Sequence, residues 1–361
     1  SFPNIMNECF PLFVDSYVHN LDTFGEPRWQ VCASHIAWLD GQCKPTRAAF
    51  YDAARHALIE TDCDPPPPVR AVLVLCASPA AHRTVSRVAA QSGILQLNPY
   101  PGAAETADSK IACYDLWKQA GVPTPRTVLI PTQSSPAIIQ STLERFRESI
   151  GRDSLLCSVQ PNSGTEGHGV NSLILETERD SEALSMVRRI LKDDDAIVRE
   201  WVGNVRIHYP GDTTGRACDL RLNVSFDGER YHAESGYMQV AGDELSMVSS
   251  TSRGGTILKF SRGALERLHG PEGHTIEWDL EMLNRIRGIA ESAVQVFPEL
   301  GLVGVDLKLE IFKSGEMGAQ VLDANPRPAG LTHSEFTPQP GKKAEPGVTR
   351  RLWRRISDAG T

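Results

Sequence analysis

The chain has 361 residues, a length typical of about two to three compact units rather than one small domain. Hydrophobic residues make up 40% and charged residues 23%, which excludes a chain that is disordered throughout. The formal net charge of −8 argues against a general binder of nucleic acid or of anionic membranes.

Targeting signals and metal-binding cysteine patterns are not evident. The longest apolar run, over 71–77, is far shorter than a membrane span, and the N-terminal residues lack the basic and apolar regions of a signal peptide. The cysteines form no C-x-x-C pair, and two of them, Cys76 and Cys157, lie in apolar runs. We therefore expect a cytoplasmic protein with free, mostly buried thiols and no zinc.

Helical and strand-like patterns alternate over the first 105 residues, which predicts an α/β unit with a mostly parallel sheet. The expected elements are an amphipathic helix over 45–60, a buried strand over 69–77, a helix over 80–91 and a short strand over 94–98. A helix over 103–120, closed by Gly121, follows this unit.

The middle of the chain again mixes helices and strands. The periodicity predicts strands over 126–130, 155–159, 170–175 and 196–202, and helices over 136–150 and 181–191. From residue 217 the pattern becomes hairpin-like, apart from a long helix over about 278–297. The Pro- and Gly-containing end, 336–361, is typical of a loose tail.

One hairpin is indicated by Asp227-Gly228 between alternating apolar flanks. A symmetric loop over 226–229 would pair Arg221 with Glu234. This pattern is compatible with a cross-strand ion pair on a solvated surface, and equally with side chains that line a site.

A second hairpin joins strands over 301–310 and 319–326 through a loop centred on Ser314-Gly315. A symmetric loop places Asp306 opposite Asp323, with Asn325 on the same face. Carboxylates about 5 Å apart at Cβ repel each other unless a cation lies between them, and three oxygen donors on adjacent strands suit Mg²⁺. The alternative is an exposed acidic pair at a strand end. Apolar neighbours such as Val305 and Leu307 argue against a wholly exposed hairpin.

The segment 161–170, PNSGTEGHGV, contains three glycines that would let backbone N–H groups approach an anion. It lacks the G-K-[ST] of a Walker A motif, and a strand rather than a helix follows, which excludes the dinucleotide fingerprint. Alone, the pattern is also typical of an ordinary flexible loop.

Taken in order, six segments resemble the ATP-grasp superfamily, and in particular its carboxylate–amine ligases. They are ADSK to AGVPTP (107–125), QPNSGTEGHGV (160–170), IVREWV (197–202), DLRLNV (219–224), GVDLKLE (304–310) and DANPRP (323–328). The resemblance covers roughly residues 70–330. It implies an ATP-grasp fold of α/β and α+β units: an N-terminal α/β pre-grasp domain (1–105), a small lid domain with its preceding helix (106–202), a large catalytic domain (203–335) and a C-terminal tail (336–361).

The resemblance also implies roles for particular residues. Lys110 would contact the nucleotide phosphates, Glu200 and Val202 would hydrogen-bond the adenine, and Arg221 and Arg327 would hold phosphate or substrate. The loop over 163–169 would close over the β- and γ-phosphates through Ser163, Gly164, Thr165, Glu166, Gly167 and Gly169. The Mg²⁺ ligands would be Asp306, Asp323 and Asn325, in agreement with the hairpin pairing.

Gln160 departs from the pattern, because related sequences carry a lysine at this position, and its site therefore lacks one cation. Arg199 and Lys308 are the two candidates to replace it. Strand alternation turns Arg199 away from the face of Glu200 and places Lys308 on the face of Asp306, so Lys308 is the expected substitute. Asp323 also stands where glutamate is more usual.

The function implied is an ATP-dependent ligase that activates a substrate carboxylate as an acyl-phosphate and joins it to the amine of an amino acid or small peptide. ATP and Mg²⁺ would be its cofactors and small molecules its partners, with no nucleic acid and no membrane; a homodimer is compatible with the sequence. Two alternatives stay open: a catalytically attenuated ATP-binding protein with a regulatory role, motivated by Gln160, and a small-molecule kinase on the same scaffold.

Overall fold

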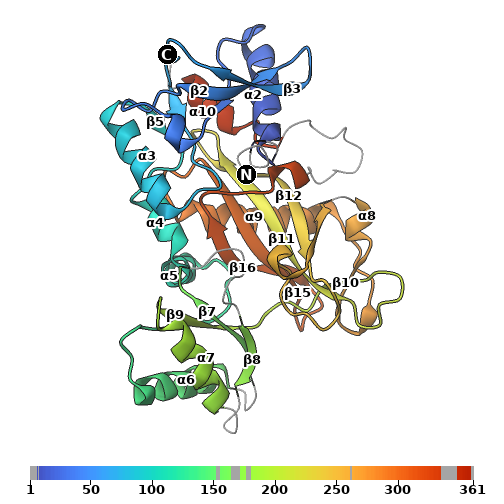
Figure 1. Cartoon of the computed structure of the whole chain (residues 1–361). Coiled ribbons are helices and arrows are strands. Elements are labelled where there is room, and N and C mark those ends of the chain that lie inside the picture. Colours follow the sequence, from blue (N-terminus) through green and yellow to red (C-terminus); the bar gives the residue numbers. More distant parts are fainter. Residues whose placement is uncertain are drawn as a thin grey trace.

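The computed structural model describes residues 6, 8–151, 155–163, 171–175, 180–260, 262–334 and 348–358. Figure 1 shows an N-terminal unit at the top, a small sheet with two helices at the bottom, and a large sheet between them. Among the described residues, no helix has both the length and the apolar character needed to cross a membrane.

The described N-terminal unit combines two α-helices, a small antiparallel sheet and a short parallel strand pair. Its elements are α2 (Phe10–Phe24), β1 (Cys32–Ala33), β2 (Arg47–Asp52), β3 (Ala57–Asp62), β4 (Ala71–Val72), α3 (Pro79–Gln91) and β5 (Leu95–Gln96). Among the strands that the structure describes, only β4 and β5 pair in parallel, and α3 lies between them in the sequence. The buried strand expected over 69–77 is therefore reduced to two partly buried residues.

The helix predicted over 45–60 is wrong, because this segment forms the β2–β3 hairpin. The Asp52 carboxylate accepts hydrogen bonds from the backbone N–H groups of Ala54 and Arg55, and His56 has a φ of 49°. These features stabilise a turn where a helix would have continued. Cross-strand pairing thus prevails over an amphipathic pattern that has no partner for a helical face.

The single helix expected over 103–120 is two helices, α4 (Ala103–Asp108) and α5 (Lys110–Ala120). Ser109 lies between them in an extended conformation, and its hydroxyl accepts the N–H of Ala112 as the N-cap of α5. Lys110 is therefore the first residue of α5, with its backbone N–H donated to the carbonyl of Asn162 in the small sheet. The break positions Lys110 at the junction between two units.

The small unit, which we call the lid, is a four-stranded antiparallel sheet in the order β6-β9-β7-β8. Its elements are β6 (Thr127–Ile130), α6 (Pro136–Ile150), β7 (Leu155–Pro161), β8 (Asn171–Leu175), α7 (Asp180–Ile190) and β9 (Ala196–Glu200). Helices α6 and α7 pack on one face, against buried residues such as Val159 and Val198. Figure 1 shows these helices on the side away from the rest of the chain, so the other face is turned toward the large sheet.

The large sheet has seven strands, with β11 paired to β10, β12 and β15 along its length. Its strands are β10 (Arg206–Ile207), β11 (Arg216–Phe226), β12 (Tyr231–Val240), β13 (Thr256–Lys259), β14 (Leu268–His269), β15 (Leu302–Ile311) and β16 (Met317–Asn325). The short α8 (Arg262–Leu265) precedes β14, and the long α9 (Leu280–Gln295) packs its buried face on β11, β12, β15 and β16. Trp117 of α5 donates its indole N–H to the carbonyl of Ala293, which ties α5 to this core.

The predicted pairing of Arg221 with Glu234 is wrong, although the β11–β12 hairpin itself forms. The turn lies over 227–230, and a bulge follows Asn223, so Arg221 pairs with Tyr237. A one-residue slip moves a side chain to the other face of a sheet, and this bulge decides which β12 side chains face the site.

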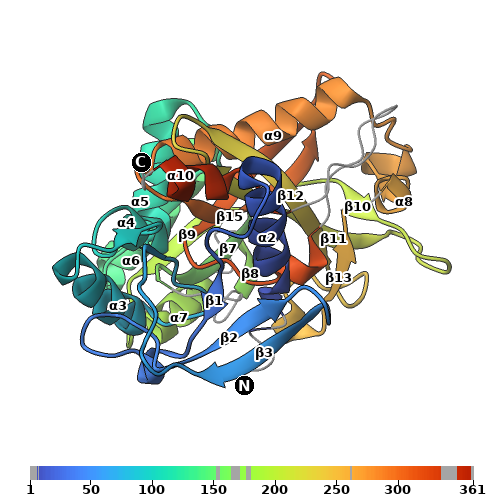
Figure 2. The same ribbon diagram turned by 90° about the horizontal axis from the view of Figure 1, so that it is seen from above.

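The chain end is not loose over the described residues 348–358. Helix α10 (Leu352–Asp358) buries Leu352 and Trp353 against α2, and Figures 1 and 2 show the two helices side by side. The Asp15 carboxylate accepts the N–H groups of Val348 and Thr349. The last segment of the chain therefore belongs to the core of the N-terminal unit.

Candidate functional site

A cavity of about 1010 Å³ lies between the open face of the lid sheet and the large sheet. Every described residue that the motifs predicted as functional lines this cavity, except Ser163. These residues are Lys110, Gln160, Glu200, Val202, Arg221, Asp306, Lys308, Asp323, Asn325 and Arg327. Segments far apart in the sequence thus meet in one space, while the role of each residue stays a prediction.

The acidic pair of the β15–β16 hairpin is confirmed in its register, since Asp306 pairs with Asp323. The pairing arises differently from the expectation: the turn has an odd number of residues, and a bulge after Asp306 compensates for it. Gly304 of β15 pairs with Asn325 of β16, and a Cβ at this position would lie 3.3 Å from the Pro328 Cβ and 3.4 Å from the Arg221 Cδ, so Arg221 passes close to the β15 backbone.

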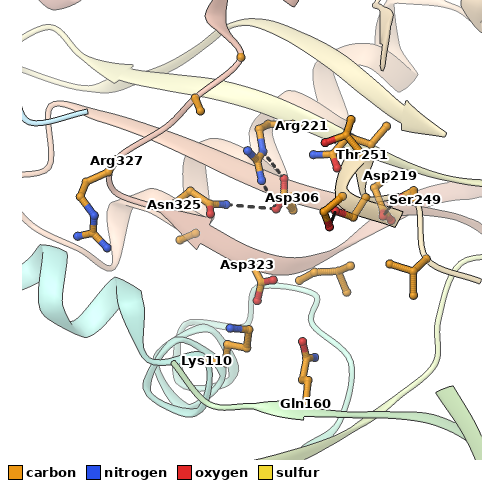
Figure 3. A pocket seen from close by; sticks show the side chains of 18 of the residues that line it. Lys110, Gln160, Asp219, Arg221, Ser249, Thr251, Asp306, Asp323, Asn325 and Arg327 are labelled. Carbon is orange, nitrogen blue, oxygen red and sulfur yellow. Dashed lines mark hydrogen bonds and ion pairs between the residues drawn. The ribbon is translucent and has the colours of Figure 1, made fainter. Parts of the chain in front are cut away.

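Arg221 is the counterion of Asp306. Its Nε lies 2.5 Å and its Nη2 2.6 Å from the two oxygens of Asp306 (Figure 3). Its Nη1 donates to the Tyr237 hydroxyl at 3.2 Å. Asn325 donates to the same carboxylate at 3.2 Å. Burial opposes the charge of Arg221, but Asp306 outweighs it and raises the pKa of the guanidinium above its usual value.

The lid wall of the cavity carries Gln160 and Arg199. Both are buried, and Arg199 lies 3.4 Å from Asp323 across the cavity. Figure 3 shows Lys110 below Asp323, with Gln160 beside it on the lid strand. Lys110, Arg199 and Asp323 therefore gather where the lid approaches the β15–β16 hairpin.

The segment after β9 connects the lid to the large sheet and presents backbone groups to the cavity. Glu200 donates its N–H to the carbonyl of Arg126, and Trp201 donates its N–H to the carbonyl of Leu156. Within the described part of the chain, the N–H of Val202 has no hydrogen-bond acceptor. A backbone donor at the cavity wall is what an adenine edge needs.

Lys308 lies beside Trp201 of the segment after β9 and does not pair with Asp306. Its Nζ is 2.5 Å from the Asp219 carboxylate, 3.3 Å from the carbonyl of Cys218 and 5.5 Å from the ring of Trp201. Asp219 also accepts the hydroxyl of Ser249. Lys308 keeps the face of Asp306, because β15 pairs with β11 without a register shift, and it bonds to Asp219, which precedes Leu220 on β11.

Arg327 is held by two residues that the motifs did not single out. Its Nη2 lies 2.5 Å from Asp108, and its Nη1 donates to Nδ1 of His82 at 3.2 Å. The Nε2 of His82 must be protonated, because it donates to the carbonyl of Asn98 at 2.7 Å. Burial lowers the pKa of His82, which keeps the ring neutral and its Nδ1 an acceptor.

Of the glycine loop over 163–169, the structure describes Ser163. Ser163 is exposed, and its hydroxyl and backbone N–H both bond to Asp194. The predicted contacts of Gly164, Thr165, Glu166, Gly167 and Gly169 lie outside the described residues.

The predicted Mg²⁺ ligands fit the ion in donor chemistry. Two carboxylates and one amide are the hard oxygen donors that Mg²⁺ prefers, and Asp323 is open to the cavity with 32% of its side chain exposed. Arg221 already balances the charge of Asp306, so metal binding there requires that this ion pair rearranges. The described residues contain no group of three or more His, Cys, Asp or Glu side chains arranged for a metal.

Sequence reasoning missed Asp108, His82, Asp219 and Ser249. Asp108 belongs to the quoted ADSK motif, and Asp219 begins the quoted DLRLNV motif, so their positions were visible but their partners were not. His82 and Ser249 carry no local pattern, because their neighbours at the site come from distant parts of the chain.

Neither a protein-family model nor a curated protein matches the chain in sequence. In structure, the VanG D-Ala:D-Ser ligase from Enterococcus faecalis matches with a TM-score of 0.51 and 14% identity, covering 88% of this chain and 79% of that one. The D-alanine–D-alanine ligase from Coxiella burnetii has a TM-score of 0.48 and 11% identity, covering 87% and 73%. The D-cycloserine synthetase DcsG has a TM-score of 0.46 and 17% identity, covering 78% of each chain. Such identities bear on the fold alone.

Proposed function

Because the chain has the ATP-grasp fold, we propose that it is an ATP-dependent, ADP-forming ligase that joins a carboxylate to the amine of an amino acid or small peptide. The observation that carries this proposal is the shared cavity, which brings the lid residues and the acidic hairpin into one space. Such a ligase must bring a nucleotide and a carboxylate together, and this cavity offers cationic and hydrogen-bonding groups for both.

The lid side of the cavity suits the nucleotide. The Val202 N–H and the apolar surface of Trp201 are suited to an adenine ring, and Lys110 to the phosphates. ATP would supply the phosphoryl group that activates the carboxylate, and Mg²⁺ held by Asp306, Asp323 and Asn325 would balance the phosphate charge.

The opposite side suits the acid to be activated. Arg327 is held by Asp108 and His82, so its guanidinium plane is oriented before a substrate arrives, whereas Arg221 would become available when its ion pair with Asp306 rearranges. A guanidinium binds a carboxylate or phosphate through two parallel hydrogen bonds. Donors fixed in advance stabilise developing negative charge without reorganising during the reaction.

One observation favours an attenuated ATP-binding protein as the second candidate. Gln160 is buried at the lid wall and brings no charge, and among the described residues its side chain donates only to Ser158. A site with one cation fewer binds phosphate less tightly, which would suit a protein that senses ATP without turning it over.

The test measures ADP and phosphate release across a panel of amino acids and short peptides, with mass spectrometry of the products. Release that requires both an acid and an amine, with an amide product, supports the ligase. ATP binding without turnover favours the attenuated protein, and a stable phosphorylated product with no amide favours a kinase. Lys110→Ala is the site variant and Lys192→Ala, an exposed residue after α7, its matched control.

A further inference from the structure

Arg199 is a buried cation on the cavity face of the lid sheet. On β9 it pairs with Ser158 of β7, and its neighbour two residues back, Ile197, pairs with Gln160. Because alternate residues share a face, Arg199 and Gln160 lie diagonally next to each other on the same face. Such diagonal neighbours are separated by about 7–8 Å, which a long side chain can span.

The contacts of Arg199 orient its guanidinium without using all its donors. Its Nε donates to the Thr127 hydroxyl at 3.3 Å, and its Nη1 to Asp323 at 3.4 Å. Both are long for charge-assisted bonds, which are typically about 2.7–2.9 Å, and longer than the contacts of 2.5 and 2.6 Å between Arg221 and Asp306. A guanidinium has five N–H donors, so most of those on Arg199 are not engaged by the described residues.

When Mg²⁺ occupies its predicted site, the charge of Arg199 requires another anion nearby. Its side chain is only 5% exposed, and its one described carboxylate partner, Asp323, is also a predicted Mg²⁺ ligand. A carboxylate that donates its charge to a metal no longer balances the cation beside it, and an unbalanced buried cation is strongly unfavourable. A phosphate in the same cavity would restore the balance.

Lys308, the substitute that strand alternation favoured, is already engaged by other side chains of the cavity. Asp219 at 2.5 Å and the Trp201 ring at 5.5 Å hold its Nζ beside the segment after β9. We therefore infer that Arg199 contacts the nucleotide phosphates and supplies the positive charge that Gln160 does not. This inference rests on the proposed function, and it assigns to Arg199 the role for which strand alternation favoured Lys308.

The experiment compares the affinities of ADP and adenosine by calorimetry in the full-length protein with Mg²⁺. Arg199→Gln should weaken ADP binding at least tenfold and change adenosine binding less than twofold, because adenosine has no phosphate. Adding Gln160→Lys to Arg199→Gln should restore most of the lost ADP affinity, since it returns a cation to the neighbouring position. Arg188→Gln removes an equal charge from the exposed face of α7 and should change neither affinity.

Two outcomes overturn the inference. Unchanged ADP affinity in Arg199→Gln shows that the phosphates do not need this cation, and equal losses for ADP and adenosine show that Arg199 only supports the lid. If Arg199→Gln does not fold, Arg199→Lys is the deciding variant. Its shorter side chain, with a single charged nitrogen, should weaken ADP binding severalfold and leave adenosine binding unchanged. An unchanged affinity for ADP overturns the inference. A wild-type protein that binds neither ligand instead refutes the proposed function, and this inference with it.

Discussion

The ion pair between Arg221 and Asp306 reverses the effect on stability that removing one of two opposed carboxylates would otherwise have. If Asp306 and Asp323 faced each other without a cation, Asp306→Asn would relieve repulsion and leave the apo protein as stable or more so. In the structure both oxygens of Asp306 bond to Arg221. The substitution should therefore destabilise the protein, because it leaves the Arg221 charge without its counterion.

The size of the loss follows from burial. Removing one partner of a buried ion pair costs about 3–5 kcal/mol. The side chains of Arg221 and Asp306 are 15% and 16% exposed, and asparagine keeps one acceptor, so the lower end of about 3 kcal/mol applies. With a urea dependence of about 3 kcal/mol per M, the unfolding midpoint should fall by about 1 M.

The assay is urea unfolding without metal or nucleotide, followed by circular dichroism and tryptophan fluorescence. Glu316→Gln is the control on the same hairpin: its pair with Arg285 is exposed, so its loss should cost less than about 1 kcal/mol. In a double-mutant cycle, Arg221→Gln combined with Asp306→Asn should cost less than the sum of the single changes. An Asp306→Asn midpoint equal to or above that of the wild type would refute the reasoning.

Three further predictions concern other parts of the molecule. Lys110→Ala should weaken ATP binding at least tenfold, about 1.4 kcal/mol, in a calorimetric titration, and the control Lys192→Ala should have no effect. Equal affinities in Lys110→Ala and the wild type would show that Lys110 does not contact the nucleotide. Asn98→Ala should cost about 3 kcal/mol in urea unfolding, because the buried Asn98 side chain accepts the N–H groups of Gly301 and Leu302 and donates to the carbonyls of Leu302 and Pro326. A loss below about 1 kcal/mol would contradict this. Burial raises the pKa of Glu234 to about 7 from the 4.5 expected in the unfolded chain. The folded state thus retains a proton that the unfolded chain has released between these pH values, so stability present below pH 4.5 is lost as the pH rises through about 7. Between pH 5 and pH 8 the free energy of unfolding of the wild type should fall by up to about 3 kcal/mol, and Glu234→Gln should abolish this fall. The same pH dependence in the variant and the wild type would refute the prediction.

Local patterns sufficed for the lid and for the order of the motifs. The helix over 136–150 and the strands around it follow from periodicity and from the prolines and glycines at their ends, which depend only on neighbouring residues. The opposition of Asp306 and Asp323 was also predictable, because both strands belong to one hairpin. Even here the predicted register depends on a bulge, which offsets a turn with an odd number of residues.

Patterns failed where a segment depended on distant partners. The amphipathic signal over 45–60 gave no hint that β2 would pair with both β1 and β3, and the composition of the chain end gave none that α10 would pack on α2. A periodic pattern reports that a face is apolar, while the element that covers this face decides whether it becomes a helix or a strand.

The residue types and the order of the site segments were thus determined by the sequence itself: carboxylates on a hairpin, a lysine at a helix start, and a hinge after a strand. Only the tertiary structure decided which charges pair. Arg221 meets Asp306 because β11 lies beside β15, and Arg199 meets Asp323 because the lid faces the hairpin. The physical reason is desolvation: a charge buried between two units needs a counterion there, and that counterion can come from any part of the chain.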